Sequence, residues 1–398
     1  MMNENFDSLI DKELADLEEK ALKRQLCLVE GFQGEKIIVD GRQVLNFCSN
    51  NYLGLAGDSR ICQAAVEAIG EEGFGAGASR LVCGHMASHR RLEKRLAEVK
   101  GAEDCLTFSS GYMANIGIIT GLFGHHDVIF CDRLNHASII DGIILSRAKM
   151  RRYPHRDMQV LEGMLRNTAG FKKRVIITDS VFSMDGDLAP LDRIVDLAER
   201  YDCAVMIDEA HALGVLGKHG GGAAQHFGVE DKIDIQMGTL SKAAGSFGAY
   251  CCGKKKLILY LVNKARSFIY TTGMPPSTAA ASLRAIEIIS EDHSLREQLW
   301  RNTRYIREGL KALGFNTMDS TTPIIPILFG DSQLTLQFSR RLFEEGILIS
   351  AIRPPTVPRG SARLRLTVTA KHTKGDMDHL LEVFKRVGKD LSPEILVE

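Results

Sequence analysis

The sequence predicts an α/β fold in which a mostly parallel sheet is sandwiched by helices and followed by a smaller α+β domain. Two observations lead to this fold class. Short apolar runs alternate with helical segments through the middle of the chain, which is typical of right-handed β-α-β units. Beyond about residue 290 the strands and long helices lose this strict alternation. We therefore expect an N-terminal helix and extended segment over 1–57, a large domain over 58–290 and a small domain over 291–398.

Each expected element rests on its residue pattern. Apolar side chains at helical spacing predict a surface helix over about 5–26, and two extended runs follow at 36–40 and 44–48. The strands expected in the large domain lie at 105–110, 127–132, 174–180, 204–210, 234–240 and 245–253, and the clearest helices at 58–71, 88–100, 254–266 and 276–290. The small domain is expected to contain strands at 324–329, 347–352 and 363–368, together with two long helices and a last helix.

Composition excludes several functional classes. The 50 Lys and Arg residues balance the 50 Asp and Glu residues, so a broad nucleic-acid-binding surface is not expected. Nine dispersed cysteines without a C-x-x-C pair indicate reduced thiols and a cytoplasmic location. The acidic N-terminus is neither a secretory signal nor a transit peptide. The uncharged stretch 105–124 contains Ser, Asn and Gly, so it predicts a strand, a turn and a helix rather than a membrane span.

Polar residues follow the predicted strands, at the sheet edge where α/β folds bind their ligands. Ser110 and Gly111 open a helix at Tyr112, and the free N–H groups there would suit an anion such as a phosphate. An ordinary helix cap explains the same residues equally well. His136 follows the next strand, where it could stack on a flat ring or shuttle a proton, or serve a structural purpose only. Ser183 lies in a third such loop.

Two further strand ends carry Asp208 and Lys242. Asp208 ends a buried strand, and such a carboxylate needs a cation or hydrogen-bond donors. Metal binding by Asp208, Glu209 and His211 is the competing interpretation, but no other ligands complete a set and no metal is expected. Lys242 could form a Schiff base if burial lowers its pKa, or it could be a solvated surface lysine. The small residues after it, Ala243-Ala244-Gly245, are expected to leave room for a flat ligand.

Together these side chains match the demands of pyridoxal 5'-phosphate (PLP). Its phosphate needs N–H donors, its ring needs a face partner, its ring nitrogen needs an acid and its aldehyde needs an amine. The order Gly111, His136, Asp208, Lys242 supplies them at successive strand ends. The glycines of GFGAGAS (73–79) do not form the G-x-G-x-x-G pattern of a dinucleotide site and follow no apolar strand.

At this point the residues resemble a family, the α-oxoamine synthases, which are fold-type I PLP-dependent transferases. The segments that carry the resemblance are NNYLGLAG (50–57), GAGASRLVCG (75–84), SSGYMAN (109–115), LNHASIIDG (134–142), VFSMDGDLAPL (181–191), IDEAHALGVLG (207–217) and GTLSK (238–242). Members of this family condense an amino acid with an acyl thioester and release carbon dioxide. The resemblance covers nearly the whole chain.

The resemblance implies a role for each candidate residue. Lys242 would bind the PLP aldehyde and move the substrate's α-proton, Asp208 would pair with the ring nitrogen, and His136 would stack on the ring. The remaining cofactor contacts would be Gly111, Tyr112 and Thr239 to the phosphate, with Ser183 and His211 near the ring hydroxyl. The substrate contacts would be His136, Arg24, Thr356 and, for the amino-acid carboxylate, either Arg353 or Arg365. Arg365 could also be a simple exposed strand residue.

The C-terminal half separates the branches of the family. IYTTGMPPS (269–277) and the segment 350–370 are most similar to the branch of biotin synthesis, which joins L-alanine to a pimeloyl thioester carried on CoA or on an acyl carrier protein. Glycine C-acetyltransferase is the alternative enzyme, and a silent partner or regulatory PLP-fold module is the non-enzyme alternative. The resemblance also implies a homodimer, with Thr272 reaching the phosphate in the neighbouring subunit.

Overall fold

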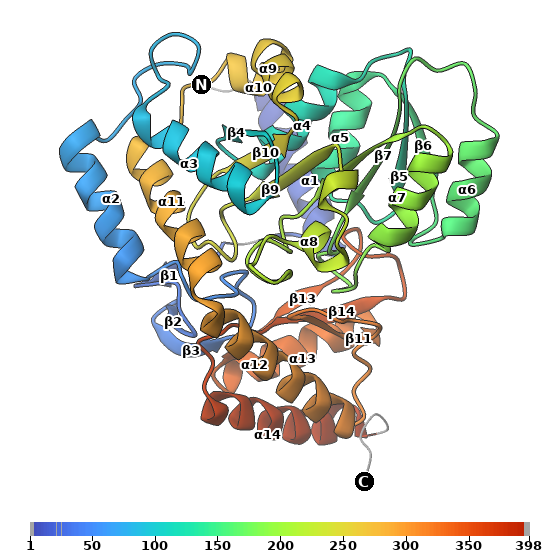
Figure 1. The fold of residues 1–398 in the computed structure, drawn as a ribbon. Coiled ribbons are helices and arrows are strands. Elements are labelled where there is room, and N and C mark those ends of the chain that lie inside the picture. The colour runs from blue at the N-terminus through green and yellow to red at the C-terminus, as the bar shows by residue number, and fades with distance from the viewer. Residues whose placement is uncertain (1–3, 21, 25, 394–398) are drawn as a thin grey trace.

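A computed structural model describes residues 4–20, 22–24 and 26–393. A seven-stranded sheet in the order β4-β10-β9-β8-β7-β5-β6 crosses the larger part of the molecule (Figure 1). Its strands are β4 (Asp104–Phe108), β5 (Val128–Asp132), β6 (Lys149–Tyr153), β7 (Arg174–Asp179), β8 (Ala204–Asp208), β9 (Ile235–Thr239) and β10 (Ala249–Gly253). Neighbouring strands are parallel from β6 to β9, and only β10 runs antiparallel to its neighbours β9 and β4. The predicted mostly parallel sheet is therefore confirmed.

Helices cover both faces of this sheet because its strands alternate in where they send their apolar side chains. On β7, Val175 and Ile177 enter one buried cluster and Ile176 enters another on the opposite face. The helices of this layer are α2 (Ser59–Glu72), α3 (Ala87–Val99), α4 (Gly111–Leu122), α5 (Ala137–Ser146), α6 (Met158–Arg166), α7 (Leu191–Arg200), α8 (Ala223–Phe227), α9 (Lys255–Lys264), α10 (Arg266–Ile269) and α11 (Pro276–Glu291), with the short 3-10 turn η1 (Glu230–Lys232). Strand β6 was not predicted, since KMRRY at this sheet edge contains no apolar run.

Two smaller sheets lie below the large one in Figure 1. The first, in the order β1-β2-β3-β12, contains β1 (Val29–Glu30), β2 (Lys36–Val39), β3 (Arg42–Asn46) and β12 (Ile347–Leu348). The second, in the order β11-β14-β13, contains β11 (Ile324–Gly330), β13 (Ser350–Ile352) and β14 (Ala362–Thr367), packed with α12 (His293–Ala312), α13 (Ser332–Glu344) and α14 (Lys374–Leu391). The single strand expected at 347–352 is thus two strands, β12 and β13, in two different sheets.

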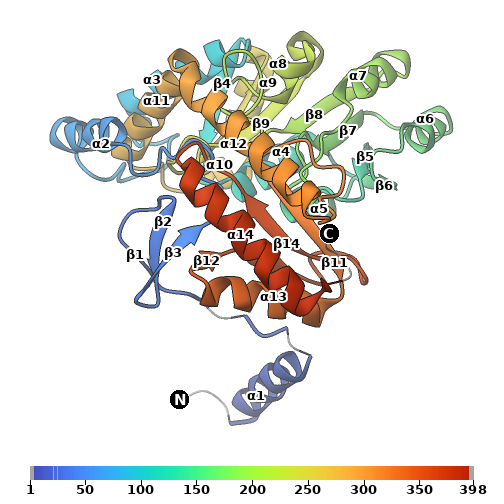
Figure 2. The same ribbon diagram turned by 90° about the horizontal axis from the view of Figure 1, so that it is seen from below.

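The N-terminal helix α1 (Glu4–Glu19) projects from the rest of the fold (Figure 2). It ends seven residues before the helix expected over 5–26, and residues 21 and 25 of that expectation lie outside the described residues. Leu9, Leu14 and Leu17 on this helix are exposed. Its amphipathic face therefore lies open in a single copy of the chain.

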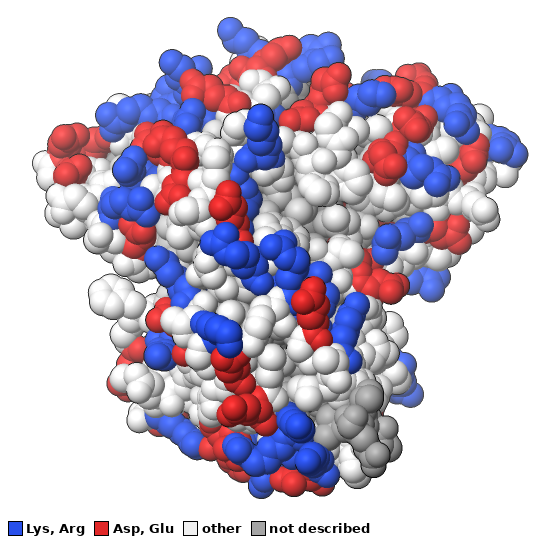
Figure 3. Space-filling model, turned by 60° about the horizontal axis from the view of Figure 1, so that its bottom comes forward, with Lys and Arg blue, Asp and Glu red and all other residues white. Residues whose placement is uncertain are grey.

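Charged side chains of both signs are interspersed over the face drawn in Figure 3. This mixture agrees with the equal numbers of basic and acidic residues in the sequence. Within residues 4–20, 22–24 and 26–393, none of the helices has both the length and the apolar character needed to cross a bilayer.

Candidate active site

The candidate residues gather where the strands of the large sheet end. Asp208 and Thr239 are the last residues of β8 and β9, and Lys242 lies three residues beyond β9. His136 precedes α5, and Arg365 reaches the same region from β14 in one of the small sheets. The site is therefore built between the large sheet and the C-terminal part of the chain, with Asn50 and Tyr52 from the segment that follows β3.

Lys242 is held by His211. Its Nζ lies 3.0 Å from His211 Nε2, and Nδ1 of the same ring lies 2.7 Å from the buried hydroxyl of Tyr52. Burial lowers the pKa of Lys242 to about 8, although the nearby carboxylates of Asp208 and Asp179 oppose this shift. Burial also lowers the pKa of His211 well below its ordinary value, and the charges of Lys242 and Arg365 lower it further. The site thus pairs a neutral imidazole with an amine that titrates near physiological pH.

Asp208 is buried and receives hydrogen bonds on both oxygens. Asn115 Nδ2 donates to Oδ2 at 2.8 Å, and the backbone N–H of Ala210 donates to Oδ1 at 2.9 Å. Asn115 also donates to Ser138 Oγ at 2.9 Å, which fixes its amide plane. Asp208 has no ion pair within 4.0 Å among the described residues. The carboxylate is therefore oriented by neutral donors and has no cation bonded to it.

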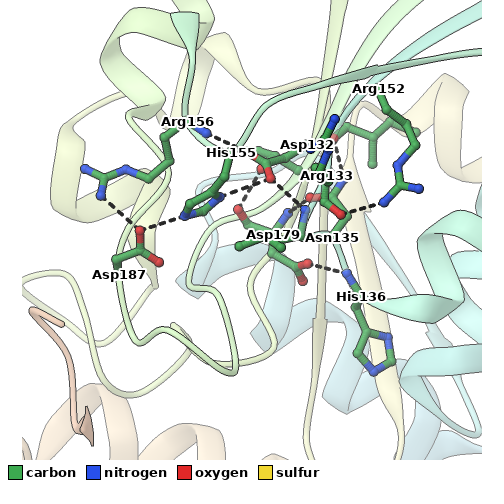
Figure 4. Close-up of polar contacts among 12 residues, drawn as sticks. Asp132, Arg133, Asn135, His136, Arg152, His155, Arg156, Asp179 and Asp187 are labelled. Atoms are coloured by element: carbon green, nitrogen blue, oxygen red, sulfur yellow. Dashed lines mark hydrogen bonds and ion pairs between the residues drawn. The ribbon is translucent and has the colours of Figure 1, made fainter. Parts of the chain in front are cut away.

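His136 is the N-cap of α5, and its backbone is anchored by Asp179 at the end of β7 (Figure 4). The His136 N–H donates to Asp179 Oδ2 at 2.6 Å, and its ring Nδ1 lies 2.8 Å from Ser138 Oγ. Desolvation lowers the pKa of His136, and the charge of Lys242 acts in the same direction. Burial and the charge of Asp208 raise the pKa of Asp179 well above its usual range. The ring of His136 thus stands on a fixed backbone beside Lys242 and Asp208.

Helix α4 begins at Gly111, one residue before the start that the sequence predicts at Tyr112. Ser110 is its N-cap and accepts from the N–H of Met113 at 3.2 Å. The N–H groups of Gly111 and Tyr112 belong to the first turn, where a helix supplies no acceptors of its own, so they are suited to an anion. Thr239 Oγ1 donates to the carbonyl of Gly248 at 2.8 Å and lies 2.7 Å from Ser241 Oγ. The Tyr112 side chain is exposed and its hydroxyl donates to Asp141.

Arg365 is buried, so the alternative of an exposed strand residue is wrong. Its Nε donates to the carbonyl of Ser183 at 2.6 Å and its Nη2 to Asn50 Oδ1 at 3.0 Å. Its charge acts on both Lys242 and His211. These contacts draw the Ser183 loop, the segment before α2 and the C-terminal strand β14 together around one guanidinium group.

The other substrate candidates lie together in a separate pocket. Arg24, Arg353 and Thr356 line a pocket of about 680 Å³ whose apolar wall includes Leu14 and Leu17 of α1. The Thr356 N–H donates to the Arg353 carbonyl at 3.0 Å. The structure thus assigns the two competing arginines to different places: Arg365 beside Lys242 and His211, and Arg353 in a pocket at the N-terminal helix.

The packing bears on two ideas from the sequence: the purpose of the small residues after Lys242, and the competing interpretation of a metal site. The small residues after Lys242 make room for the chain itself, because Ala243 and Ala244 are buried and a Cβ on Gly245 would lie 2.3 Å from Ala56 N. Packing within the chain is therefore one reason for small residues at these positions. Within the described part of the chain no group of three or more His, Cys, Asp or Glu side chains is arranged to hold a metal. Glu209 forms a buried ion pair with Lys100.

Three site residues were not assigned a role from the sequence. Asn115 bonds both Asp208 and Ser138, whereas Tyr52 and Asn50 together connect His211 with Arg365. Asn115 lies at the end of SSGYMAN and the other two lie in NNYLGLAG, so both stretches were noticed for their resemblance. Their partners are up to 315 residues away in sequence, and this is why no local pattern could identify them.

The residues present fit PLP. The test is the donor set: a buried carboxylate without an ionic partner, an amine with a pKa near 8 beside it, and a helix start with free N–H groups at the same sheet edge. A protonated ring nitrogen would give Asp208 the cation that the described residues do not bond to it. The Lys242 amine would bind the aldehyde, and the first turn of α4 would receive the phosphate.

Comparisons with known proteins agree with this geometry. The chain matches the family Aminotransferase class I and II over residues 42–384. Over 382 residues it is 50% identical to the 8-amino-7-oxononanoate synthase of Citrifermentans bemidjiense, with 96% of this chain and 98% of that protein covered. It superposes on SPT with a PLP internal aldimine at a TM-score of 0.92 and 30% identity, covering 97% of this chain and 98% of the other. For the 8-amino-7-oxononanoate synthase of Francisella tularensis the TM-score is 0.76 and the identity 31%, over 88% and 98% of the two chains.

Proposed function

This chain belongs to the class I and II aminotransferase family, and from that membership we propose that it acts as an 8-amino-7-oxononanoate synthase. It is a PLP-dependent acyltransferase of fold type I, and its resemblance to the α-oxoamine synthases is confirmed. The proposed reaction joins L-alanine to a pimeloyl thioester with loss of carbon dioxide, as a step of biotin synthesis. One observation carries the proposal: about half of all residues are identical to enzymes of that name over nearly the full length.

Bound PLP supplies a ring that accepts the electron pair released at the amino acid's α-carbon. The protein's part is to hold protons and substrates at stated atoms. The Asp208 carboxyl group, whose orientation is fixed by Asn115, would pair with the ring nitrogen and keep the proton there. Lys242 Nζ would take the α-proton and later return it, because an amine with a pKa of about 8 can exist in either form near neutral pH. His136 would orient the acyl carbonyl, since its backbone is fixed by Asp179 and its ring by Ser138.

Two sites would bind the two substrates. Arg365 would hold the alanine carboxylate, since its buried guanidinium already lies beside Lys242 and bonds the Ser183 and Asn50 oxygens in a fixed orientation. The pocket at α1 would hold the acyl chain: Leu14 and Leu17 offer apolar surface, and Arg24 and Arg353 offer charge for an anionic chain end or carrier. Both CoA and an acyl carrier protein carry phosphate, which the same arginines would attract.

A substrate comparison tests the proposal. Purified holoenzyme is offered alanine with pimeloyl-CoA, alanine with a pimeloyl carrier protein, or glycine with acetyl-CoA, and thiol release and product are measured. We expect 8-amino-7-oxononanoate from an alanine mixture and little turnover of glycine with acetyl-CoA. The Lys242→Ala variant is the matched control and should lose both turnover and the absorption of covalently bound cofactor. Preferred turnover of glycine with acetyl-CoA would assign the chain to glycine C-acetyltransferase instead.

The homodimer and the cytoplasmic location are part of the same proposal. Phe74, Val82 and Tyr270 are exposed apolar side chains around the bridge between Ser79 and Thr272, and the leucines of α1 are exposed as well. Such a surface favours association with a second copy, which would bring Thr272 toward the neighbouring site. The nine cysteines form no disulfide, as in a reducing compartment. Light scattering after gel filtration measures the mass, and a monomer at micromolar concentration would contradict the dimer.

A further inference from the structure

A chain of hydrogen bonds connects Lys242 with Arg365 through three residues of the site. Lys242 Nζ lies 3.0 Å from His211 Nε2, and His211 Nδ1 lies 2.7 Å from the Tyr52 hydroxyl. The same hydroxyl lies 3.3 Å from Asn50 Oδ1, to which Arg365 Nη2 donates at 3.0 Å. Tyr52 is 1% exposed, so water does not compete for its hydroxyl group.

The direction of each bond follows from the charges at the two ends. The pKa of Lys242 is about 8, so at neutral pH this side chain is mainly an ammonium ion, which can only donate. His211 is neutral, because burial and nearby cations lower its pKa well below the usual value, so it carries one N–H. Its Nε2 must therefore accept from Lys242, and the hydrogen must be on Nδ1.

The other half of the chain is fixed in the same way. His211 Nδ1 donates to the Tyr52 oxygen, so the Tyr52 hydrogen must point elsewhere. Burial raises the pKa of Tyr52 to about 12, which means that the hydroxyl keeps this hydrogen at neutral pH. Asn50 Oδ1 can accept this hydrogen, and Arg365 holds the amide oxygen facing this way because a guanidinium can only donate. Arg365 also interacts with the Tyr52 hydroxyl, and there too it can only donate to the oxygen, so it cannot take the hydrogen.

We propose that Tyr52 is a positioning residue that holds His211 in its Nδ1–H tautomer and thereby keeps a lone pair on Nε2 aimed at Lys242. Tyr52 touches neither the substrate nor the reacting atoms in this role. An acceptor at Nε2 stabilises the ammonium form of Lys242 and fixes where its Nζ lies. The effect of the Lys242 Nζ position on turnover rests on the proposed function. The His211 tautomer, in contrast, is a property of the protein without cofactor or substrate, so an experiment can contradict either one without contradicting the other.

The tautomer is measured directly by nitrogen NMR on cofactor-free protein labelled with ¹⁵N-histidine at pH 7. The His211→Gln variant identifies the His211 signals among the twelve histidines. We expect a protonated Nδ1 and an unprotonated Nε2 in the wild type. In Tyr52→Phe the Nδ1–H would be buried without an acceptor, a cost that opposes the preference set by Lys242, so the signals should move toward those of a tautomer mixture. The wild-type spectrum alone overturns the proposal if Nε2 carries the hydrogen.

The second measurement follows Lys242 itself. The rate of its modification by trinitrobenzenesulfonate is recorded against pH, and in Tyr52→Phe we expect the midpoint to fall by about half a pH unit, because the ammonium form loses its fixed acceptor. Asp208, Asp179 and Arg365 also act on this amine and are unchanged in the variant.

A control and a second variant separate this effect from general loosening. Tyr250→Phe removes another fully buried tyrosine hydroxyl, one without a hydrogen-bond partner among the described residues, and should leave tautomer and midpoint unchanged. Asn50→Ala leaves Tyr52 in place but removes the acceptor of its hydrogen, so Tyr52 can donate to Nδ1 and the tautomer mixture should reappear. An unchanged His211 tautomer in both Tyr52→Phe and Asn50→Ala refutes the proposal even if one of them folds poorly.

Discussion

The buried ion pair between Lys100 and Glu209, the residue that follows Asp208, allows the size of a stability change to be predicted. Lys100, which caps α3, is 1% exposed and Glu209 is 0% exposed. Lys100 Nζ donates to Glu209 Oε2 and to the carbonyl of Gly221, while Glu209 Oε1 accepts from the Ala224 N–H at 2.8 Å. The pair thus ties α3, the end of β8 and the loop before α8 together.

Replacing Lys100 with Met should be strongly destabilising. The methionine fills the space but leaves the Glu209 carboxylate buried without a cation, a change that costs about 3–5 kcal/mol. Since the unfolding entropy of a 398-residue chain is roughly 0.8 kcal/mol/K, each kcal/mol lowers Tm by about 1.2 °C, and the melting temperature should fall by about 4–6 °C. Urea unfolding of the cofactor-free protein at pH 7, followed by circular dichroism, measures the free energy of unfolding.

The double variant Lys100→Met with Glu209→Gln is the matched control. The amide introduced by the second change can still accept from Ala224 and can donate to Gly221, so no buried charge is left unpaired and most of the lost stability should return. We expect a coupling energy of at least about 2 kcal/mol between the two positions. The reasoning is refuted if Lys100→Met alone costs less than about 1 kcal/mol, or if the effects of the two single changes simply add in the double variant.

Three further outcomes are expected. Asp208→Asn should still bind PLP but exchange the alanine α-proton about 10²-fold more slowly, as seen by proton NMR in deuterium oxide, and normal exchange would remove Asp208 from the proposed role. Arg365→Ala should raise KM for alanine about 10-fold or more, whereas Arg353→Ala should raise KM for the thioester; equal effects on both substrates would contradict the two-site assignment. Burial opposes the charge of His155, but its hydrogen bonds to Asp132 and Asp187 outweigh this and raise its pKa to about 9, so its stabilising effect is complete below about pH 6.5 and is lost as pH rises through 9. His155→Gln should therefore lower the urea midpoint most at pH 6 and least at pH 10, and a difference that grows with pH would disprove this.

Much of the large domain could be predicted from the sequence because its strands are buried on both faces. Continuous apolar runs such as that ending at Asp208 mark such strands, and the polar residue after each run marks the ligand edge. Strand β6 was not predicted, because an edge strand with one solvated face needs no continuous apolar run. The division of residues 347–352 between two sheets was not predicted, because the residue pattern of a strand does not indicate which sheet the strand joins.

A candidate site residue could be predicted only where the surrounding segment itself indicates that the residue lies at the site. Lys242, Asp208 and His136 lie at strand ends, so local pattern locates them. The choice between Arg353 and Arg365 depends on which arginine meets Ser183 and Asn50, and those contacts join segments far apart in the chain. Tyr52 was missed for the same reason, since its partner His211 is 159 residues away. The domain boundary near 290 stays a prediction.

The pairing of β12 with β3 has a consequence for how the polypeptide is made. Leu45 pairs with Ile347, so the outer edge of β3 stays open until nearly the whole chain has been synthesised. At about 5–20 residues per second a ribosome needs roughly 15–60 s to deliver the missing strand. Throughout this interval the backbone N–H and C=O groups of the edge are available to other chains. Truncated products that end before Ile347 are therefore expected to be the species most prone to aggregation and proteolysis.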